Sequence, residues 1–176
     1  GGKGADSLSG GDGHDTFVFA NTGANNGADV LTITAGETAN ADILNFKNFL
    51  SGGAVAQNAG AGTGIIAYTS SSVLDANITN KVALYTDATE TNIDEASEIA
   101  ALIAGSGNAF SVTAGGKSIL VTGDASGAND VANIWFIDDA LDGVLGTVSS
   151  TDVVLVGTTA AALDLDTLTT YNFAFA

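Results

Sequence analysis

The chain has 176 residues and a formal charge of −16, because its 20 acidic residues face four lysines and no arginine. This length corresponds to one domain or two small ones. The charge argues against nucleic acid as a partner, since phosphate contacts need a basic patch. An anionic membrane surface would repel the chain for the same reason.

Besides Arg, three residue types are missing from the sequence: Cys, Met and Pro. Without Cys there are no disulfides or thiolate metal sites, so an extracellular fold would need another staple, such as bound calcium. No run of about 18 apolar residues predicts a membrane span, and we expect no direct membrane insertion. The lack of Met indicates a fragment or a processed chain. The first residues also lack a basic-then-apolar export signal, so the export address of a secreted protein would lie elsewhere, for example at the C-terminus.

The chain opens with two consecutive nine-residue units, GGKGADSLS and GGDGHDTFV, which share the pattern Gly-Gly-x-Gly-x-Asp-x-apolar-x. The glycines predict tight turns with backbone angles that other residues avoid. Such turns expose carbonyl oxygens, and Asp6 and Asp15 each add a carboxylate. Ca²⁺ prefers a shell of about six to eight oxygens. The pattern therefore predicts calcium-binding turns, each followed by a short strand with Leu8 or Phe17 pointing inward.

These units, with the strand TFVF that follows the second turn, resemble the end of an array of RTX nonapeptide repeats. The resemblance implies a parallel β-roll, in which calcium lies between turns stacked on the same side. It also implies export through a type I secretion apparatus, made of an ABC transporter, a membrane fusion protein and an outer-membrane duct, under an uncleaved C-terminal signal. Residues 82–176 are similar, more loosely, to C-terminal regions of large RTX adhesins and surface-layer proteins.

The candidate calcium ligands are the carboxylates and exposed carbonyls of the two turns. They are the carboxylates of Asp6 and Asp15 and the carbonyl oxygens of Gly1, Lys3, Gly10 and Asp12. His14 is expected to face solvent, since calcium takes oxygen ligands.

A complete calcium site in a β-roll needs units two apart, because consecutive units alternate sides. The chain holds only two regular units, so each site needs a second half from elsewhere. That half would come from a nearby polar side chain or from RTX repeats upstream in the same protein. The candidate side chains are Asn21, Asn25, Asn26 and Asp29.

An acidic turn at 138–146, DDALDGVLG, gives a second candidate calcium site. We expect Asp138 and Asp142 to be its ligands, because three acids this close, with Asp139 between them, gain from a cation. Asp-rich turns also commonly face water without a metal, so both interpretations stay open.

The rest of the chain predicts a mostly β fold with one helix. Apolar and β-branched residues indicate strands at 28–34, 41–50, 65–71, 81–87, 132–139, 152–159 and 171–176. Residues 92–107 predict the helix, with Asn92 and Glu95 as a capping box. Residues 110–124 predict a hairpin around Gly115 and Gly116.

The glycine-rich stretch 51–64 predicts a boundary or a surface loop. We therefore expect three regions: the end of an RTX β-roll at 1–20, capping strands and loops at 21–63, and a β-rich α+β domain with the secretion signal at 64–176. The expected fold class is a short parallel β-roll end followed by this β-rich domain.

We expect no enzymatic activity, because the sequence has no Gly-x-Ser-x-Gly elbow, His-Glu-x-x-His pair or Cys nucleophile. The resemblance implies a calcium-dependent folding and type I secretion module of a large adhesin or surface-layer protein, secreted or held at the cell surface. One alternative is the same region of an exported protease or lipase whose catalytic domain lies upstream. Another is a structural cap that shields the last turn of the roll from edge-to-edge association.

Overall fold

The computed structural model describes residues 1–36, 39–50, 65–69, 76–86, 93–103, 110–123 and 131–174, and for 65–69 it gives the backbone alone. The predicted boundary at 51–64 lies outside these residues, as does Asn92 of the predicted helix cap. Within them the fold is mostly β, as the sequence predicts.

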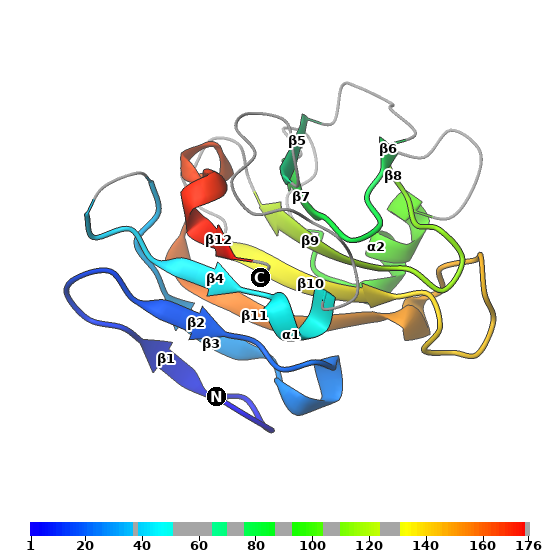
Figure 1. Cartoon of the computed structure of the whole chain (residues 1–176), viewed down its shortest axis with the longest axis horizontal. Coiled ribbons are helices and arrows are strands. Elements are labelled where there is room, and N and C mark those ends of the chain that lie inside the picture. Colours follow the sequence, from blue (N-terminus) through cyan, green and yellow to red (C-terminus); the bar gives the residue numbers. More distant parts are fainter. Residues whose placement is uncertain are drawn as a thin grey trace.

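Two sheets form the body of the structure, and the smaller lies in front of the larger in Figure 1. The larger has seven strands in the order β1 (Ser7–Ser9), β3 (Asp29–Thr32), β11 (Val153–Ala162), β10 (Val131–Asp138), β9 (Lys117–Gly123), β7 (Val82–Thr86) and β5 (Ile65–Thr69). The smaller has three, in the order β12 (Phe173–Ala174), β4 (Ile43–Asn45) and β2 (Thr16–Val18). A further parallel pair joins β6 (Ala76–Asn77) to β8 (Phe110–Ser111).

The strands of the opening units enter different sheets. β1 pairs in parallel with β3 in the larger sheet, with Leu8 opposite Leu31. β2 pairs in parallel with β4 in the smaller sheet, with Phe17 opposite Leu44. The two sheets are then extended by strands from the far end of the sequence, because β11 pairs with β3 and β12 pairs with β4.

The strand pairing therefore crosses both predicted region boundaries. Each sheet contains strands from 1–20, from 21–63 and from 64–176. The division into three regions stays a prediction from sequence.

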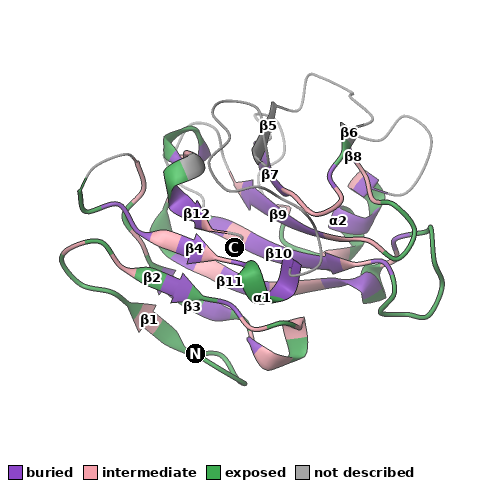
Figure 2. Cartoon of the chain, in the orientation of Figure 1, coloured by how far each residue is buried: buried purple, intermediate pink, exposed green. Residues whose placement is uncertain are grey.

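The seven-stranded sheet is buried on both faces along its centre (Figure 2). Alternate side chains of a strand point to opposite faces. In β9, Ile119 and Val121 pack toward the smaller sheet, whereas Leu120 joins Trp135 in a second core on the other face. The smaller sheet thus covers one face, and α2 (Ala96–Ile103) covers the other through Ile99 and Ile103.

The described residues form two α-helices, where the sequence predicts one. α2 confirms the predicted helix but begins at Ala96, where the Glu98 carboxylate accepts hydrogen bonds from the backbone N–H groups of Asp94 (3.1 Å) and Glu95 (3.2 Å). The other, α1 (Lys47–Leu50), replaces the second half of the strand predicted at 41–50. The Asn45 side chain ends β4 by accepting from the Lys47 N–H at 3.0 Å, which begins the turn.

The hairpin predicted at 110–124 is wrong. The turn forms, with a hydrogen bond of 2.6 Å from the Gly116 N–H to the Thr113 carbonyl, but the strands on either side do not pair with each other. β8 pairs with β6, while β9 lies between β7 and β10. The reason is that β7 and β10 occupy both edges of β9, so no edge remains for β8, and residues 118–122 are buried inside this sheet.

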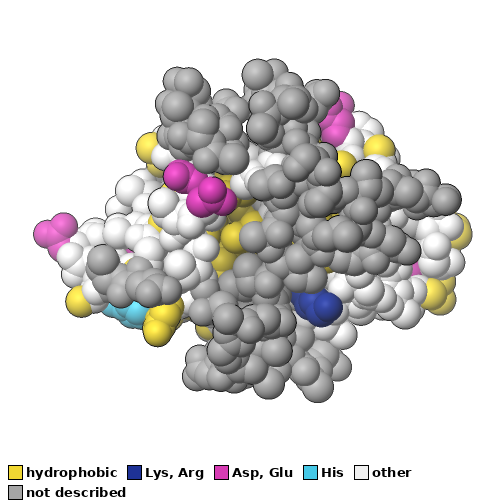
Figure 3. All heavy atoms as spheres, turned by 90° about the horizontal axis from the view of Figure 1, so that it is seen from above, with side chains coloured by type: hydrophobic (Ala, Val, Ile, Leu, Met, Phe, Trp, Pro, Cys, Tyr) yellow, Lys and Arg dark blue, Asp and Glu magenta, His cyan; other side chains and the backbone are white. Residues whose placement is uncertain are grey.

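On the face seen in Figure 3, the Asp and Glu side chains of the described residues lie at several separate places and do not form one acidic patch. None of the helices in the described part of the chain is long and apolar enough to cross a membrane.

Candidate metal centre

The two opening turns use glycine at positions where the backbone has positive φ. These angles are +117° at Gly2 and +105° at Gly4 in the first turn, and +92° at Gly11 and +117° at Gly13 in the second. Side chains rarely allow such angles. The second and fourth places of the motif therefore need glycine for conformational reasons, as the sequence predicts.

The first glycine of each turn is needed for space. A Cβ at Gly1 would overlap the carboxylate of Asp29, and a Cβ at Gly10 would overlap the carboxylate of Asp15. The missing side chain thus brings an acidic group directly against the turn backbone. Oxygen atoms placed in this way suit a hard cation such as Ca²⁺.

The first turn stacks on a turn that ends at Asp29. The Asp6 N–H donates to Asp29 Oδ1 at 2.9 Å, and the Val30 N–H donates to the Asp6 carbonyl at 2.8 Å. Gly27 lies so close to the first turn that a Cβ there would overlap the Gly4 carbonyl oxygen. Of the four side chains predicted as possible partners, Asp29 is the one that contacts the Asp6 turn.

The second turn stacks in the same way on a turn that ends at Asp42. The Asp15 N–H donates to Asp42 Oδ1 at 3.0 Å, and the Ile43 N–H donates to the Asp15 carbonyl at 2.8 Å. The other carboxylate oxygen of Asp42 accepts from the Thr34 N–H at 2.8 Å. Asp42 and Asp29 therefore have equivalent positions: each accepts a hydrogen bond from the backbone N–H of the earlier aspartate, Asp15 and Asp6 respectively.

Sequence reasoning missed Asp42, although a weak signal was present. GADSLS at 4–9 matches GADVLT at 27–32, and GHDTFV at 13–18 matches NADILN at 40–45. The successive aspartates Asp6, Asp15, Asp29 and Asp42 follow one another at steps of 9, 14 and 13 residues, so the two later turns depart from the nine-residue step. A search for the Asp-x-Leu strand start alone, without the glycines, would have found them.

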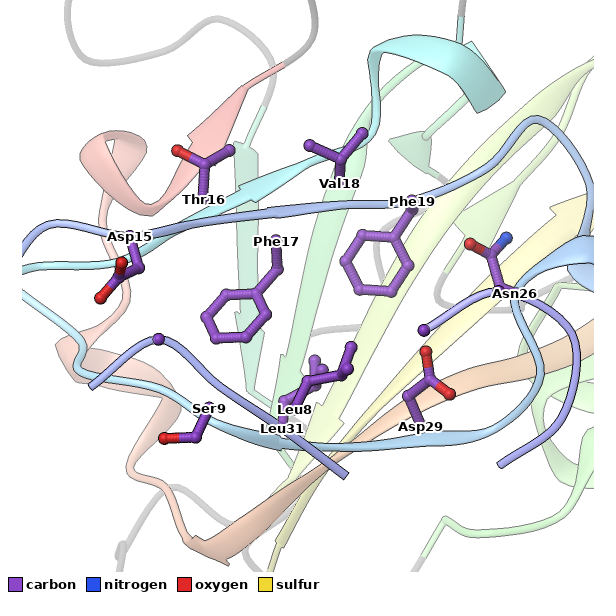
Figure 4. Close-up of a pocket in the computed structure, with 13 residues that line it drawn as sticks. Leu8, Ser9, Asp15, Thr16, Phe17, Val18, Phe19, Asn26, Asp29 and Leu31 are labelled. Atoms are coloured by element: carbon purple, nitrogen blue, oxygen red, sulfur yellow. The ribbon is translucent and has the colours of Figure 1, made fainter. Parts of the chain in front are cut away.

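The two strand pairs enclose a groove of about 290 Å³ at the edge formed by β1 and β2 (Figure 4). Leu8, Phe17, Phe19 and Leu31 point into its centre from the two sheets. One end is lined by Asp15, and the other by Asp29 with Asn26. The groove is thus apolar in the middle and has a carboxylate at each end.

One carboxylate oxygen of Asp15 gives the clearest structural argument for an ion at this site. This oxygen, Oδ2, is buried and has no hydrogen-bond partner among the described residues. A buried carboxylate oxygen without a partner is costly, and natural structures nearly always give it a donor, a water or an ion. The residues of this turn therefore fit the calcium ion that the motif implies.

The other predicted turn residues lie at the surface. Gly1, Lys3, Asp6, Gly10, Asp12 and His14 are exposed. Among the described residues, no three His, Cys, Asp or Glu side chains come together as a metal cage. A turn that binds calcium mainly through backbone carbonyl oxygens contributes only one carboxylate. Such a turn therefore would not bring three acidic side chains together.

The remaining candidate partners are engaged within their own loop. Asn26 is buried, accepts from the Ala20 N–H at 2.6 Å and donates to the Thr22 carbonyl at 2.7 Å. Asn25 donates to the side chain of Asn21 at 3.3 Å. These amides shape the loop between β2 and β3.

The acidic turn at 138–146 is held by its own carboxylates. Asp138 pairs with the ammonium group of Lys117 at 3.1 Å, and Asp142 Oδ2 accepts from the Ser149 hydroxyl at 2.9 Å. The buried Asp139 accepts from the N–H groups of Gly115 (2.7 Å) and Gly146 (2.6 Å), while its Oδ1 has no partner among the described residues. Calcium binding by Asp138 and Asp142 stays a prediction.

Comparison with protein-family models, curated protein sequences and solved structures gives no match to this chain.

Proposed function

We propose that residues 1–45 are the end of an RTX-type β-roll, whose Gly-Asp turns fold around calcium, and that the strands joined to it belong to a type I secretion module. The observation that carries the proposal is the paired stacking of the Asp6 turn on Asp29 and of the Asp15 turn on Asp42. Alternate units lie on the same side, which is the arrangement a β-roll needs.

The turns supply the ligands that the ion would use. Asp15 offers a buried carboxylate oxygen that lacks a hydrogen-bond donor, and the Asp29 carboxylate lies against Gly1. The turn carbonyls of the first and third motif positions would complete the shell. When bound, the ion supplies the positive charge that this set of oxygens lacks.

The charge and the glycines together make the fold depend on the ion. A formal charge of −16 opposes a compact state, and glycine-rich turns lose more backbone entropy on folding than other turns. Extracellular calcium modules bind at about 10⁻⁴–10⁻³ M. Calcium outside the cell would then stabilise the fold by mass action, while scarce calcium inside keeps the chain extended for export.

The edge formed by β1 and β2 is the proposed contact with upstream RTX repeats. Among the described residues, β1 pairs with β3 alone and β2 with β4 alone. The carboxylates of Asp29 and Asp42 each accept from a backbone N–H of the unit two before their own. By the same pattern, Asp6 and Asp15 would serve two units before Gly1, and the apolar groove would receive the inward side chains of these units. The Cys-free, glycine-rich composition suits a large adhesin or surface-layer protein as the parent.

The folding proposal is tested with Asp15→Asn, and Asp12→Asn is the matched control, because Asp12 is exposed and its carbonyl stays in place. Thermal unfolding followed by circular dichroism is measured at increasing CaCl₂ and with a chelator. We expect calcium to raise the midpoint of the wild type and of Asp12→Asn, and to raise that of Asp15→Asn much less. Equal calcium responses in the two variants, or none in the wild type, would contradict the proposal.

The export proposal has its own test. A reporter fused to this chain is expected to appear in the medium of cells that carry a type I apparatus, and a fusion that lacks residues 117–176 is expected to stay inside. Equal export of both fusions would contradict the export proposal and would favour the alternative in which residues 117–176 are a structural cap.

A further inference from the structure

The side chain of Asn172 joins two segments that are distant in the sequence, residues 36–42 and residues 169–172. It is 1% exposed and donates from Nδ2 to the backbone carbonyl of Asp42 at 2.9 Å. Its Oδ1 accepts from the N–H groups of Thr169 (3.0 Å) and Gly36 (3.2 Å). These hydrogen bonds form only while residues 36–42 and 169–172 keep their present packing. If that packing were lost, buried polar groups would be left without partners, which is costly in free energy.

Asn172 positions β12 on the smaller sheet. Phe173 follows it and is buried against Phe46, with ring centroids 6.3 Å apart. The Phe46 N–H donates to the Ala174 carbonyl at 2.8 Å. The docked segment 169–174 thus depends on the same turn that ends at Asp42.

Asp42 connects this docked segment to the candidate calcium turn. Its side chain accepts from the Asp15 N–H, while its backbone carbonyl accepts from Asn172. Asp15 is the residue with the buried carboxylate oxygen that lacks a partner. One residue therefore contacts both the ion turn and the segment that contains β12.

We propose that Asp42 couples calcium binding at the Asp15 turn to docking of residues 169–174, so that each event favours the other. This inference rests on the proposed function and adds a regulated segment to it. With calcium bound, the segment is held in the smaller sheet. Without calcium, it undocks and is available to a partner that binds an extended peptide, which for a secretion module is the export apparatus.

The reciprocity of coupling gives the test. If docking favours calcium, then weakening the dock must weaken calcium binding. Calcium affinity is measured by isothermal titration calorimetry for the wild type and for Asn172→Ala. Coupling energies between sites commonly correspond to about 5-fold to 150-fold in affinity, so we expect at least a ~5-fold weaker affinity in this variant.

A matched control separates this effect from general destabilisation. Thr122 is buried in β9, donates to the Ile93 carbonyl at 3.1 Å and accepts from the Trp135 indole N–H at 3.1 Å. Thr122→Val removes these bonds in the other core. The loss of melting temperature is measured for both variants, and their calcium affinities are compared with this loss taken into account. Any remaining difference in calcium affinity then reflects where in the fold the substitution lies.

The outcomes distinguish the coupling from the proposed function. A larger loss of affinity in Asn172→Ala than in Thr122→Val supports the coupling. Equal losses overturn it and leave calcium-dependent folding intact, whereas a wild type that binds no calcium overturns both. If Asn172→Ala does not fold, Phe173→Leu loosens the same dock with a milder change, and the same comparison decides.

Discussion

Glycine has two separate duties in the repeat turns, at the scale of single residues. Gly13 has a φ of +117°, and no neighbouring atom lies within 4 Å of the place that a Cβ would take, so its requirement is conformational. Gly10 instead leaves room for the Asp15 carboxylate. The same residue type therefore shapes the turn at one place and admits the acidic group at another.

The conformational duty predicts a cost for Gly13→Ala. Holding a non-glycine residue in a sparsely populated region costs about 1–3 kcal/mol, and no clash adds to it here. We expect a loss of this size in the free energy of unfolding, measured by denaturant titration in saturating calcium. His14→Ala, in the same turn at an exposed residue, should change the value by less than about 0.5 kcal/mol. Similar values for both would contradict the assignment.

Sequence alone predicted the glycine turns, because their glycines recur nine residues apart, while the role of Asp6 and Asp15 as calcium ligands stays a prediction. Asp42 was not predicted as a partner, because its turn lacks these glycines and does not follow the earlier turn at the nine-residue step. Its role is set by strand register, with Thr16 opposite Ile43, and register between distant strands is not written locally in the sequence.

At the scale of elements, the strands after the turns are three residues long and have one inward side chain each. Phe17 in β2 is 9% exposed, whereas its neighbour Val18 is 63% exposed. Such short strands hold their place through this single apolar contact and through the turn hydrogen bonds on either side.

Because Phe17 is buried and Val18 is exposed, substitutions at these adjacent positions of β2 should have very different effects on the free energy of unfolding. Phe17→Ala opens a cavity between the sheets and should lower the free energy of unfolding by about 3–5 kcal/mol. Val18→Ala changes an exposed position and should stay within about 0.5 kcal/mol. Chemical denaturation of both variants measures this, and a large effect of Val18→Ala would mean that the two faces of β2 are assigned the wrong way round.

Most strands and the main helix were predictable because their apolar spacing is strong. The errors arose where neighbours in space decide the outcome. β9 follows a Gly-Gly turn and looks like half of a hairpin, but β7 and β10 occupy both of its edges, so β8 cannot pair with it. α1 follows β4 closely, and its helical turn buries both Phe49 and Leu50, whereas a strand would turn adjacent side chains to opposite faces.

At the scale of the whole molecule, one core joins the two ends of the sequence. The cluster between the sheets includes Phe17 and Phe19 near the start, Phe136 in β10 and Phe173 in β12. A core shared in this way makes independent unfolding of its parts unfavourable.

We therefore expect the described structure to unfold in one transition when calcium is present. Fluorescence of the buried Trp135 reports on the second core, and far-UV circular dichroism reports on all strands. Their midpoints should coincide, as should the calorimetric and van't Hoff enthalpies. Two separate transitions would instead support independent folding of the predicted domain at 64–176 and of the two predicted regions before it, 1–20 and 21–63.

The pairing of β4 with β12 has a consequence for the order of assembly. In this pairing Leu44 lies opposite Phe173. In the larger sheet, β3 likewise pairs with β11, a strand from much later in the sequence. Contacts between residues so far apart in sequence form late, because a long loop must close first. A nascent chain cannot complete either sheet until the ribosome has made its last strands. Premature compaction during synthesis is thereby discouraged by connectivity itself, whatever the ion concentration around it.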